Sequence, residues 1–246
     1  MAPRPVSLVL DGFATGRENM ERDEWLLARG EPVVRLYGWD PACVSLGRTQ
    51  TEADIDLDAA ERHGIDVVRR KTGGGALLHN EVELTYAVIL PLDHPGLSRN
   101  ILESYRTMSG PILDAFRALG VDAVFGEGKG GRDTLCYLRE EGVSIFVDGR
   151  KISGGAQRRT QQAVLQHGTM VLRLDAERTA EVLKAPVEAV RRKVVGLDAL
   201  GFAVTRDEVV NEVVAAYERG LGPLERARAP WQGDEEWRPE ITELTV

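Results

Sequence analysis

The most informative stretch of this chain runs from residue 69 to residue 79 and reads Arg69-Arg70-Lys71-Thr72-Gly73-Gly74-Gly75-Ala76-Leu77-Leu78-His79. Three consecutive glycines let the backbone reach positive φ and approach a ligand closely. Their amide N–H groups can bind an anion or a carbonyl oxygen, and the preceding arginines and lysine add positive charge. A surface hairpin loop with solvated arginines accounts for the same residues. The stretch matches neither a P-loop nor a G-x-G-x-x-G motif, so it does not indicate a nucleotide-binding fold of those types.

A second glycine-containing segment follows a strong hairpin signal. The residues from 143 to 147 alternate as a strand does, and Asp148-Gly149 favours a two-residue β-turn. Lys151 therefore lies just past a tight turn, where its ammonium group can polarise an acyl carbonyl or hold a phosphate. An exposed hairpin lysine is the alternative, and it is the commonest fate of this residue type. Gly154 and Gly155 again permit close approach to the backbone.

The two cysteines, Cys43 and Cys136, differ in their surroundings. Cys43 lies in an apolar run, which favours a small buried side chain. Cys136 has polar neighbours, and a thiolate is a good nucleophile towards thioesters when nearby cations lower its pKa. Candidate cations are Lys129, Arg132 and Lys151. Two cysteines so far apart in the chain do not form a disulfide framework.

Two histidines are candidate site residues because of their position. His79 ends the first glycine stretch, and His167 precedes Gly168-Thr169. An imidazole can position a carbonyl or relay a proton. Each histidine by itself is more often a hydrogen-bonded structural residue.

The periodicity of the chain predicts a mixed α+β domain, rich in strands over its first two thirds and helical after residue 175. The catalytic domain is expected to span 1–220, followed by a loosely structured tail at 221–246 that contains three prolines. We expect strands at 6–10, 32–37, 43–46, 66–70, 84–90, 143–147, 150–152 and 168–174, and helices at 19–27, 56–63, 111–119, 176–184, 187–194 and 207–217.

The composition is ordinary for a soluble globular protein, with 246 residues, 43% hydrophobic and 28% charged. No run of about 18 apolar residues occurs, and the start of the chain lacks the pattern of a signal peptide. We therefore expect a cytoplasmic protein with no membrane partner. The net charge of −8, without a long basic block, argues against a nucleic-acid partner. No C-x-x-C motif or dense His/Cys cluster occurs, so no metal site is expected.

Several ordered motifs between residues 19 and 175 reinforce one another. They are Asn19-Met20 with Asp23-Glu24 and Leu26-Leu27, Arg35-Leu36-Tyr37-Gly38-Trp39, Ser45-Leu46-Gly47-Arg48 with Gln50, the loop from Arg70 to His79, Glu83-Leu84-Thr85-Tyr86, Gly149-Arg150-Lys151-Ile152 with Gly154, Ala156, Gln157 and Arg159, and His167-Gly168-Thr169. Together they resemble the biotin/lipoate protein ligase and lipoyl/octanoyl transferase superfamily. The resemblance implies a class II biotin/lipoate ligase-like catalytic domain, with mixed, mostly antiparallel sheets flanked by helices.

Members of that superfamily hold an acyl chain in a tunnel beneath the glycine loop, and a lysine contacts the acyl carbonyl. The resemblance gives the lysine role to Lys151. Cys136 precedes Lys151, which is similar to the octanoyltransferases typical of Gram-positive bacteria; the short octanoyltransferases carry their cysteine after the lysine, where this chain has none. The resemblance gives the loop role to Arg70, Gly73, Gly74, Gly75 and His79, and we add Gly154, Gly155, Ala156 and His167 as candidate substrate-binding residues.

The hypothesis that the motifs favour is transfer of an octanoyl or lipoyl group by an acyltransferase without a cofactor. Cys136 takes the group from a carrier-protein thioester, with Lys151 as the second catalytic residue, and passes it to a lysine of a lipoyl domain. The donor is expected to be acyl carrier protein, and the acceptor a lipoyl-domain protein such as the glycine-cleavage H protein.

Two alternatives remain open from the sequence. The first is an ATP-dependent lipoate–protein ligase that uses ATP and magnesium, in which Arg70 and Lys151 contact the phosphate of an acyl-adenylate. The second is a non-catalytic protein that binds lipoyl domains or acyl groups. The sequence also leaves open octanoate against lipoate, the acceptor domain and the oligomeric state.

Overall fold

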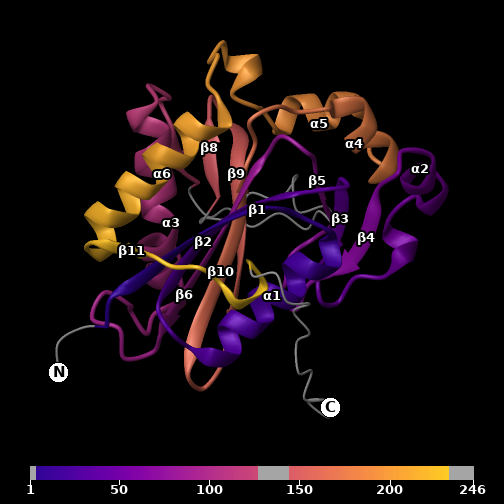
Figure 1. The fold of residues 1–246 in the computed structure, drawn as a ribbon. Helices are drawn as coiled ribbons and strands as arrows, with labels where there is room; N and C mark the ends of the chain where they lie inside the picture. The colour runs from indigo at the N-terminus through magenta and orange to yellow at the C-terminus, as the bar shows by residue number, and fades with distance from the viewer. Residues whose placement is uncertain (1–3, 127–143, 233–246) are drawn as a thin grey trace.

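The computed structural model of the chain describes residues 4–126 and 144–232, which form two β-sheets and the helices that cover them (Figure 1). In chain order the elements are β1 (Val6–Ala14), α1 (Gly16–Arg29), β2 (Val33–Trp39), β3 (Cys43–Leu46), η1 (Glu52–Asp54), α2 (Leu57–Arg62), β4 (Asp66–Arg69), β5 (Leu77–His79), β6 (Leu84–Pro91), α3 (Ile101–Ala118), β7 (Val124–Phe125), β8 (Ile145–Val147), β9 (Arg150–Arg159), β10 (Ala163–Met170), α4 (Ala176–Val182), α5 (Val187–Lys193), η3 (Asp198–Leu200), α6 (Arg206–Leu221), β11 (Leu224–Arg226) and η4 (Pro230–Gln232).

The larger sheet has eight strands in the order β11-β1-β2-β6-β10-β9-β8-β7, and the smaller sheet has three in the order β4-β3-β5. In the larger sheet β1 runs parallel to its two neighbours, β2 and β11. All the other pairs of adjacent strands in that sheet are antiparallel. In the smaller sheet β3 is parallel to β4 and antiparallel to β5. The mixed, mostly antiparallel α+β architecture predicted from the sequence is confirmed.

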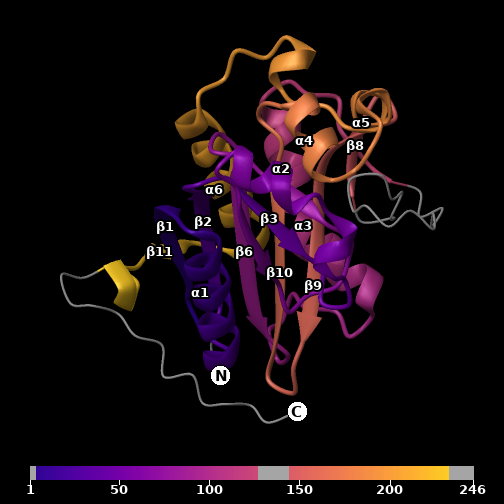
Figure 2. The same cartoon turned by 90° about the vertical axis from the view of Figure 1, so that its right-hand side faces the viewer.

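The two faces of the large sheet are covered differently. Figures 1 and 2 show α3 and α6 on one face, and α1 together with the small sheet on the other. Successive residues of a strand point to opposite faces, so β2 contributes Val34 and Leu36 to the core under α3 and α6, and Val33 and Tyr37 to the core under α1. The face towards α1 and the small sheet is the one on which the candidate site lies.

The long helices begin at strong capping signals. Thr15 and Glu18 form a capping box at the start of α1, and Thr205 and Glu208 form another at the start of α6. None of the helices within residues 4–126 and 144–232 is long and apolar enough to cross a bilayer.

Two elements differ from the prediction in ways that matter for the site. The helix expected from residue 111 begins at Ile101, with Asn100 as its N-cap, and Pro111 lies inside it. The strand expected at 168–174 is β10, which spans Ala163–Met170 and pairs along its whole length with β6. His167 therefore lies within a strand of the sheet rather than in front of one, and its side chain has a fixed direction.

Part of the segment expected to be a loosely structured tail is ordered against the domain. β11 pairs with β1 through Val6, Ser7 and Leu8, and Trp231 is buried with its indole Nε1–H donating to Asp11 Oδ1 at 2.8 Å. The expectation of loose structure is therefore wrong for residues 224–232, because β11 pairs with β1 and the Trp231 ring is buried against the domain. The boundary at residue 220 itself stays a prediction.

Candidate active site

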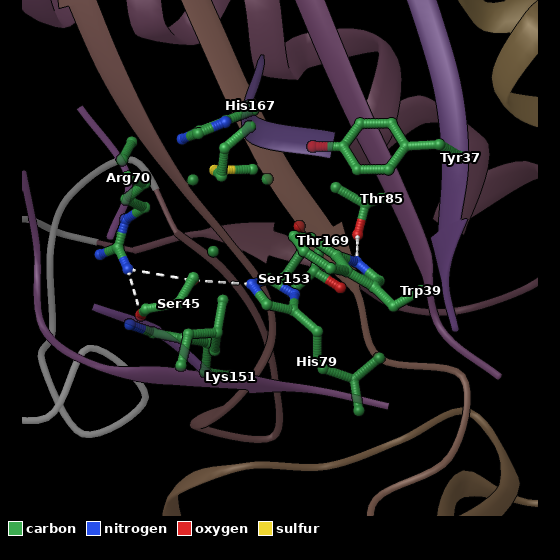
Figure 3. A pocket seen from close by; sticks show the side chains of 17 residues that line it. Tyr37, Trp39, Ser45, Arg70, His79, Thr85, Lys151, Ser153, His167 and Thr169 are labelled. Atoms are coloured by element: carbon green, nitrogen blue, oxygen red, sulfur yellow. Dashed lines mark hydrogen bonds between the residues drawn. The ribbon is translucent and has the colours of Figure 1, made fainter. Parts of the chain in front are cut away.

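A cavity between the two sheets collects most of the residues that the sequence singled out. It holds about 550 Å³ of space between protein atoms, its mouth included, and Figure 3 shows the side chains around it. Seven of the predicted site residues line it: Arg70, His79, Lys151, Gly154, Gly155, Ala156 and His167. The other lining residues are Met20, Tyr37, Trp39, Ser45, Leu77, Thr85, Ser153, Gly168, Thr169 and Val171.

The register of the large sheet explains the floor of the cavity. Thr85 on β6, Thr169 on β10 and Gly154 on β9 are directly paired neighbours across three strands. Two residues further along β10, His167 is paired with Ala156. Residues two apart on a strand share a face, so these side chains all point into the same space. The small residues on β9 leave that space open.

Arg70 holds the glycine loop in place. Its guanidinium group donates to the carbonyl oxygens of Gly73 at 2.9 Å, Gly75 at 2.7 Å and Ser45 at 2.6 Å. The side chain is buried, and these bonds join the loop to β3 of the small sheet. The structure thus shows Arg70 as a clamp on the loop backbone; contact between Arg70 and a substrate stays a prediction.

The glycines of the loop have different requirements. Gly74 adopts φ +95°, a conformation that side-chain-bearing residues rarely take. Gly73 does not have a positive φ, and an added Cβ there would meet open space. Of the glycines that the structure describes, the one with the least space for a side chain is Gly47, directly after β3. A Cβ on Gly47 would lie 2.0 Å from the carbonyl oxygen of Gly74.

Replacing Gly47 by alanine is expected to lower the free energy of unfolding by about 1–3 kcal/mol, because the backbone of Gly74 must move away from the new methyl group. The matched control is Gly73→Ala, which adds the same methyl group to the same loop in open space and is expected to leave stability unchanged or slightly higher. Urea denaturation of both variants measures the difference. Equal stabilities would show that the loop does not pack on Gly47 as described.

His79 lies at the centre of a chain of hydrogen bonds. Its Nδ1 lies 2.6 Å from Glu83 Oε1 and its Nε2 lies 2.8 Å from Ser45 Oγ. Ser45 Oγ also accepts from Arg70 at 3.1 Å. Trp39 stacks on the imidazole, with ring centroids 4.0 Å apart. These contacts fix the position of the ring in the cavity wall.

His167 is held by a buried carboxylate. Its Nδ1 lies 2.9 Å from Asp23 Oδ2, and its Nε2 lies 2.8 Å from the hydroxyl of Thr72 in the glycine loop. Asp23 also accepts from Arg35 at 2.7 Å and from the Tyr37 hydroxyl at 3.0 Å. Burial raises the pKa of Asp23, but the His167 hydrogen bond and the Arg35 charge outweigh that effect and leave the pKa lowered. Asp23 therefore carries its negative charge at neutral pH and orients His167.

Lys151 reaches the cavity from β9. The residue is 3% exposed, and its Nζ lies 5.9 Å from the centre of the Phe146 ring. Its backbone carbonyl accepts from Val195 at 3.0 Å, which ties this part of β9 to the segment after α5. The lysine is thus enclosed within the cavity wall, with its ammonium group near the Phe146 ring.

The structure describes one of the two cysteines. Cys136 lies outside the described residues. Cys43 is buried in β3, and burial, followed by the charges of Asp66 and Glu83, raises the pKa of its thiol far above the ordinary value. A protonated and enclosed thiol does not act as a nucleophile at neutral pH. This agrees with the structural role that the sequence predicted for Cys43.

The sequence assigned no role to several residues that the structure places at the site. Ser45, Thr85, Trp39 and Glu83 all belong to motifs quoted above. Ser45, Thr85 and Trp39 acquire their roles through hydrogen bonds between residues far apart in the chain. Glu83 lies directly before β6 and bonds to His79 and Thr85, which are close to it in the sequence. Among the described residues, no group of three or more His, Cys, Asp or Glu side chains is arranged to hold a metal ion.

The sequence of the chain is similar to those of several known proteins. The sequence profile of the lipoyl protein ligase A/B catalytic domain matches residues 15–218. Octanoyltransferase LipM of Geobacillus kaustophilus is 35% identical, with 96% of this chain and 98% of that protein covered. Octanoyltransferase LipM of Bacillus subtilis is 35% identical, with 85% and 84% covered.

Solved structures give the same result for the fold. Protein Ta0514 of T. acidophilum, assigned as a lipoate protein ligase and solved with bound lipoic acid, is 25% identical with a TM-score of 0.79, covering 91% of this chain and 89% of that one. A lipoate-protein ligase A bound with ATP is 26% identical with a TM-score of 0.77, covering 92% and 89%.

Proposed function

The chain belongs to the lipoyl protein ligase A/B catalytic domain family, and from that premise we propose that it transfers an octanoyl group from a carrier-protein thioester to a lysine of a lipoyl domain. The observation that carries the proposal is the cavity between the sheets, with Lys151 in its wall and the Arg70-clamped glycine loop at its side. The near full-length relatives named octanoyltransferase support the octanoyl group as cargo and an acyltransferase as the class of enzyme.

The cavity suits an aliphatic chain. Met20, Leu77, Ala156 and Val171 contribute apolar side chains to its wall, while the polar groups around His79 bond to one another. Each CH₂ group of an acyl chain buried there contributes about 0.8 kcal/mol of transfer free energy. An eight-carbon chain therefore gains enough to bind without polar contacts along its length.

The first proposed step forms an acyl-enzyme. The Cys136 thiolate attacks the carbonyl carbon of the octanoyl thioester, a new C–S bond forms, and the thiol of the carrier leaves as a thiolate that takes up a proton. The Lys151 ammonium group and the loop amides stabilise the negative charge that develops on the carbonyl oxygen. A thioester intermediate keeps the acyl group reactive towards an amine, so the step loses little driving force.

The second proposed step transfers the group to the acceptor. The neutral ε-amine of a lipoyl-domain lysine attacks the acyl-Cys136 carbonyl, the C–N bond forms, the C–S bond breaks, and the proton of the amine returns to the thiolate. Acyl carrier protein is the proposed donor, and the glycine-cleavage H protein a proposed acceptor. Arg69 and Lys71 are exposed beside the glycine loop, where positive charge steers acidic partners towards the site.

Incubation with octanoyl-acyl carrier protein tests the proposal. Intact-protein mass spectrometry is expected to show one added octanoyl group, and peptide mapping is expected to place it on Cys136 and not on Cys43. Addition of unmodified H protein is then expected to move the group to an acceptor lysine. A label on Cys43, or octanoylation of the acceptor without any labelled enzyme, would contradict the acyl-enzyme mechanism.

A second candidate function is ATP-dependent ligation of lipoate, favoured by the similarity to the ATP-bound lipoate-protein ligase A. In that case Arg70 and Lys151 contact an acyl-adenylate, and Cys136 takes no part. Incubation with lipoate, ATP and magnesium separates the two candidates. Release of pyrophosphate that persists in a Cys136→Ala variant would establish the ligase, and its absence in the wild-type protein supports transfer from a thioester.

A further inference from the structure

The hydroxyl of Thr169 differs from the other polar groups of the cavity. Within residues 4–126 and 144–232, Thr169 Oγ1 is the one buried side-chain oxygen without a hydrogen-bond partner; the other buried side-chain atoms without partners are arginine nitrogens. Thr169 is 1% exposed and lines the cavity, and Figure 3 shows it among the lining side chains near Thr85 and Ser153. A buried hydroxyl without a partner costs about 1–3 kcal/mol, so its presence calls for a function.

The neighbouring hydroxyls show that this part of the sheet does satisfy its polar groups. Thr85, which is paired with Thr169 across β6 and β10, accepts from Trp39 Nε1 at 2.8 Å and donates to Glu83 at 3.0 Å. Thr72 bonds to His167. Thr169 is of the same residue type, on the same face and at a neighbouring position as Thr85, and it alone of these three threonines has no protein partner.

The position of Thr169 relates it to Lys151. Thr169 is paired directly with Gly154 on β9, and a Cβ added to Gly154 would lie 3.6 Å from Lys151 Cδ. The missing side chain of Gly154 therefore leaves open the space between the Thr169 side chain and the stem of Lys151. An acyl group that enters this space passes both residues.

We infer that the Thr169 hydroxyl donates a hydrogen bond to the carbonyl oxygen of the bound acyl group, as a second donor beside Lys151; this rests on the proposed function. The carbonyl oxygen is the acceptor that the chemistry of the substrate offers. An octanoyl thioester has one strong acceptor, its carbonyl, and the rest of the chain consists of CH₂ and CH₃ groups and a weakly accepting sulfur. A hydroxyl in the wall can therefore be satisfied by this substrate at one place only.

The inferred bond also affects the rate of transfer. As the nucleophile attacks, the carbonyl oxygen gains negative charge, and a donor already in place binds it more strongly than it binds the ground-state carbonyl. No protein group satisfies the Thr169 hydroxyl, and the carbonyl oxygen of the substrate supplies an acceptor for it. Thr169 is then a residue whose removal harms activity without harming the fold, which is the opposite of what a structural threonine does.

The test compares Thr169→Val, Thr169→Ser and Thr85→Val. Thr169→Val keeps the shape and removes the hydroxyl, so its midpoint of thermal unfolding is expected to equal or exceed that of the wild type, while kcat/KM for octanoyl transfer from octanoyl-acyl carrier protein falls about tenfold to hundredfold. Thr169→Ser keeps the hydroxyl and is expected to retain most of the activity. Thr85→Val, the matched control, takes the acceptor away from Trp39 Nε1 and removes one of the hydrogen bonds to Glu83, so it is expected to lower the unfolding midpoint.

Binding of an analogue completes the test. An acyl carrier protein whose pantetheine arm carries an S-octyl thioether has the chain but no carbonyl, so it is expected to bind wild type and Thr169→Val equally. A Thr169→Val protein with wild-type kcat/KM, or a Thr169→Ser protein as impaired as Thr169→Val, would overturn the inference while leaving the proposed function intact. A wild-type protein that transfers no octanoyl group would overturn both.

Discussion

Replacing Lys151 by methionine is expected to lower kcat/KM for octanoyl transfer by about 10²–10³-fold, the usual cost of removing one donor that stabilises a developing oxyanion. Methionine has a similar length and no charge, so the change removes the ammonium group and keeps most of the packing against Phe146. Lys151 is 3% exposed, and a charge in such an enclosed apolar site acts on a carbonyl oxygen far more strongly than a charge in water does.

The split between binding and chemistry identifies the role of the ammonium group. Because Lys151 is proposed to act on an oxygen that gains charge only during attack, the loss is expected mainly in kcat, with the affinity for the S-octyl carrier analogue unchanged. The Lys184→Met variant is the control, since Lys184 is exposed at the end of α4 and does not line the cavity. A folded Lys151→Met protein that transfers octanoate at the wild-type rate would exclude this role.

Replacing Arg35 by methionine is expected to lower the free energy of unfolding by about 3–5 kcal/mol, because it takes the arginine countercharge from the buried Asp23 carboxylate and leaves Asp11 with Arg22 as its countercharge. Arg35 is fully buried and bonds to Asp11 at 2.6 Å, to Asp23 at 2.7 Å and to Asn19 Oδ1 at 2.7 Å. Asp11 in turn accepts from Trp231. One guanidinium group thus joins β1, β2, α1 and the segment after β11, and it also orients His167 through Asp23.

Urea denaturation as a function of pH measures this effect and checks its cause. The pKa of Asp23 is lowered in the folded protein, so the stability that its charge contributes is present above its unfolded value of about 3.9 and is lost as the pH falls further. Without Arg35 the buried Asp23 carboxylate becomes less costly to the fold when it is protonated. The difference between wild type and Arg35→Met is therefore expected to shrink below about pH 4.

An exposed ion pair provides the comparison. Arg62 bonds to Glu181 at 2.6 Å, with 59% and 45% of the two side chains exposed. Arg62→Met is expected to change stability by at most about 1 kcal/mol, because water screens that pair. If Arg35→Met were no more destabilising than Arg62→Met, the buried cluster would not contribute to the fold as described.

The sequence was most informative where local pattern and chemistry coincide. The apolar runs of β2 and β6 and the Asp148-Gly149 turn before β9 are local properties of the sequence. They predict two strands of the sheet and the hairpin that precedes Lys151, and the structure has both. The sequence predicts the start of α3 ten residues too late, because proline is common in the first turn of a helix; in the structure Asn100 caps the helix and Pro111 lies inside it. The strand expected at 168–174 lies at Ala163–Met170 in the structure, because β10 forms hydrogen bonds with β6 along that range.

The sequence by itself determined the superfamily, the α+β class, and the residue types that carry the proposed chemistry, because these depend on motifs of a few neighbouring residues. Only the tertiary structure decided what each residue contacts. It showed that Arg70 clamps the loop carbonyls, that Asp23 and Arg35 support His167, and that Thr169 differs from Thr85 in having no protein partner. Hydrogen bonds and burial join residues that are far apart in the chain, such as Asp23 and His167, and no local pattern specifies which of them will meet.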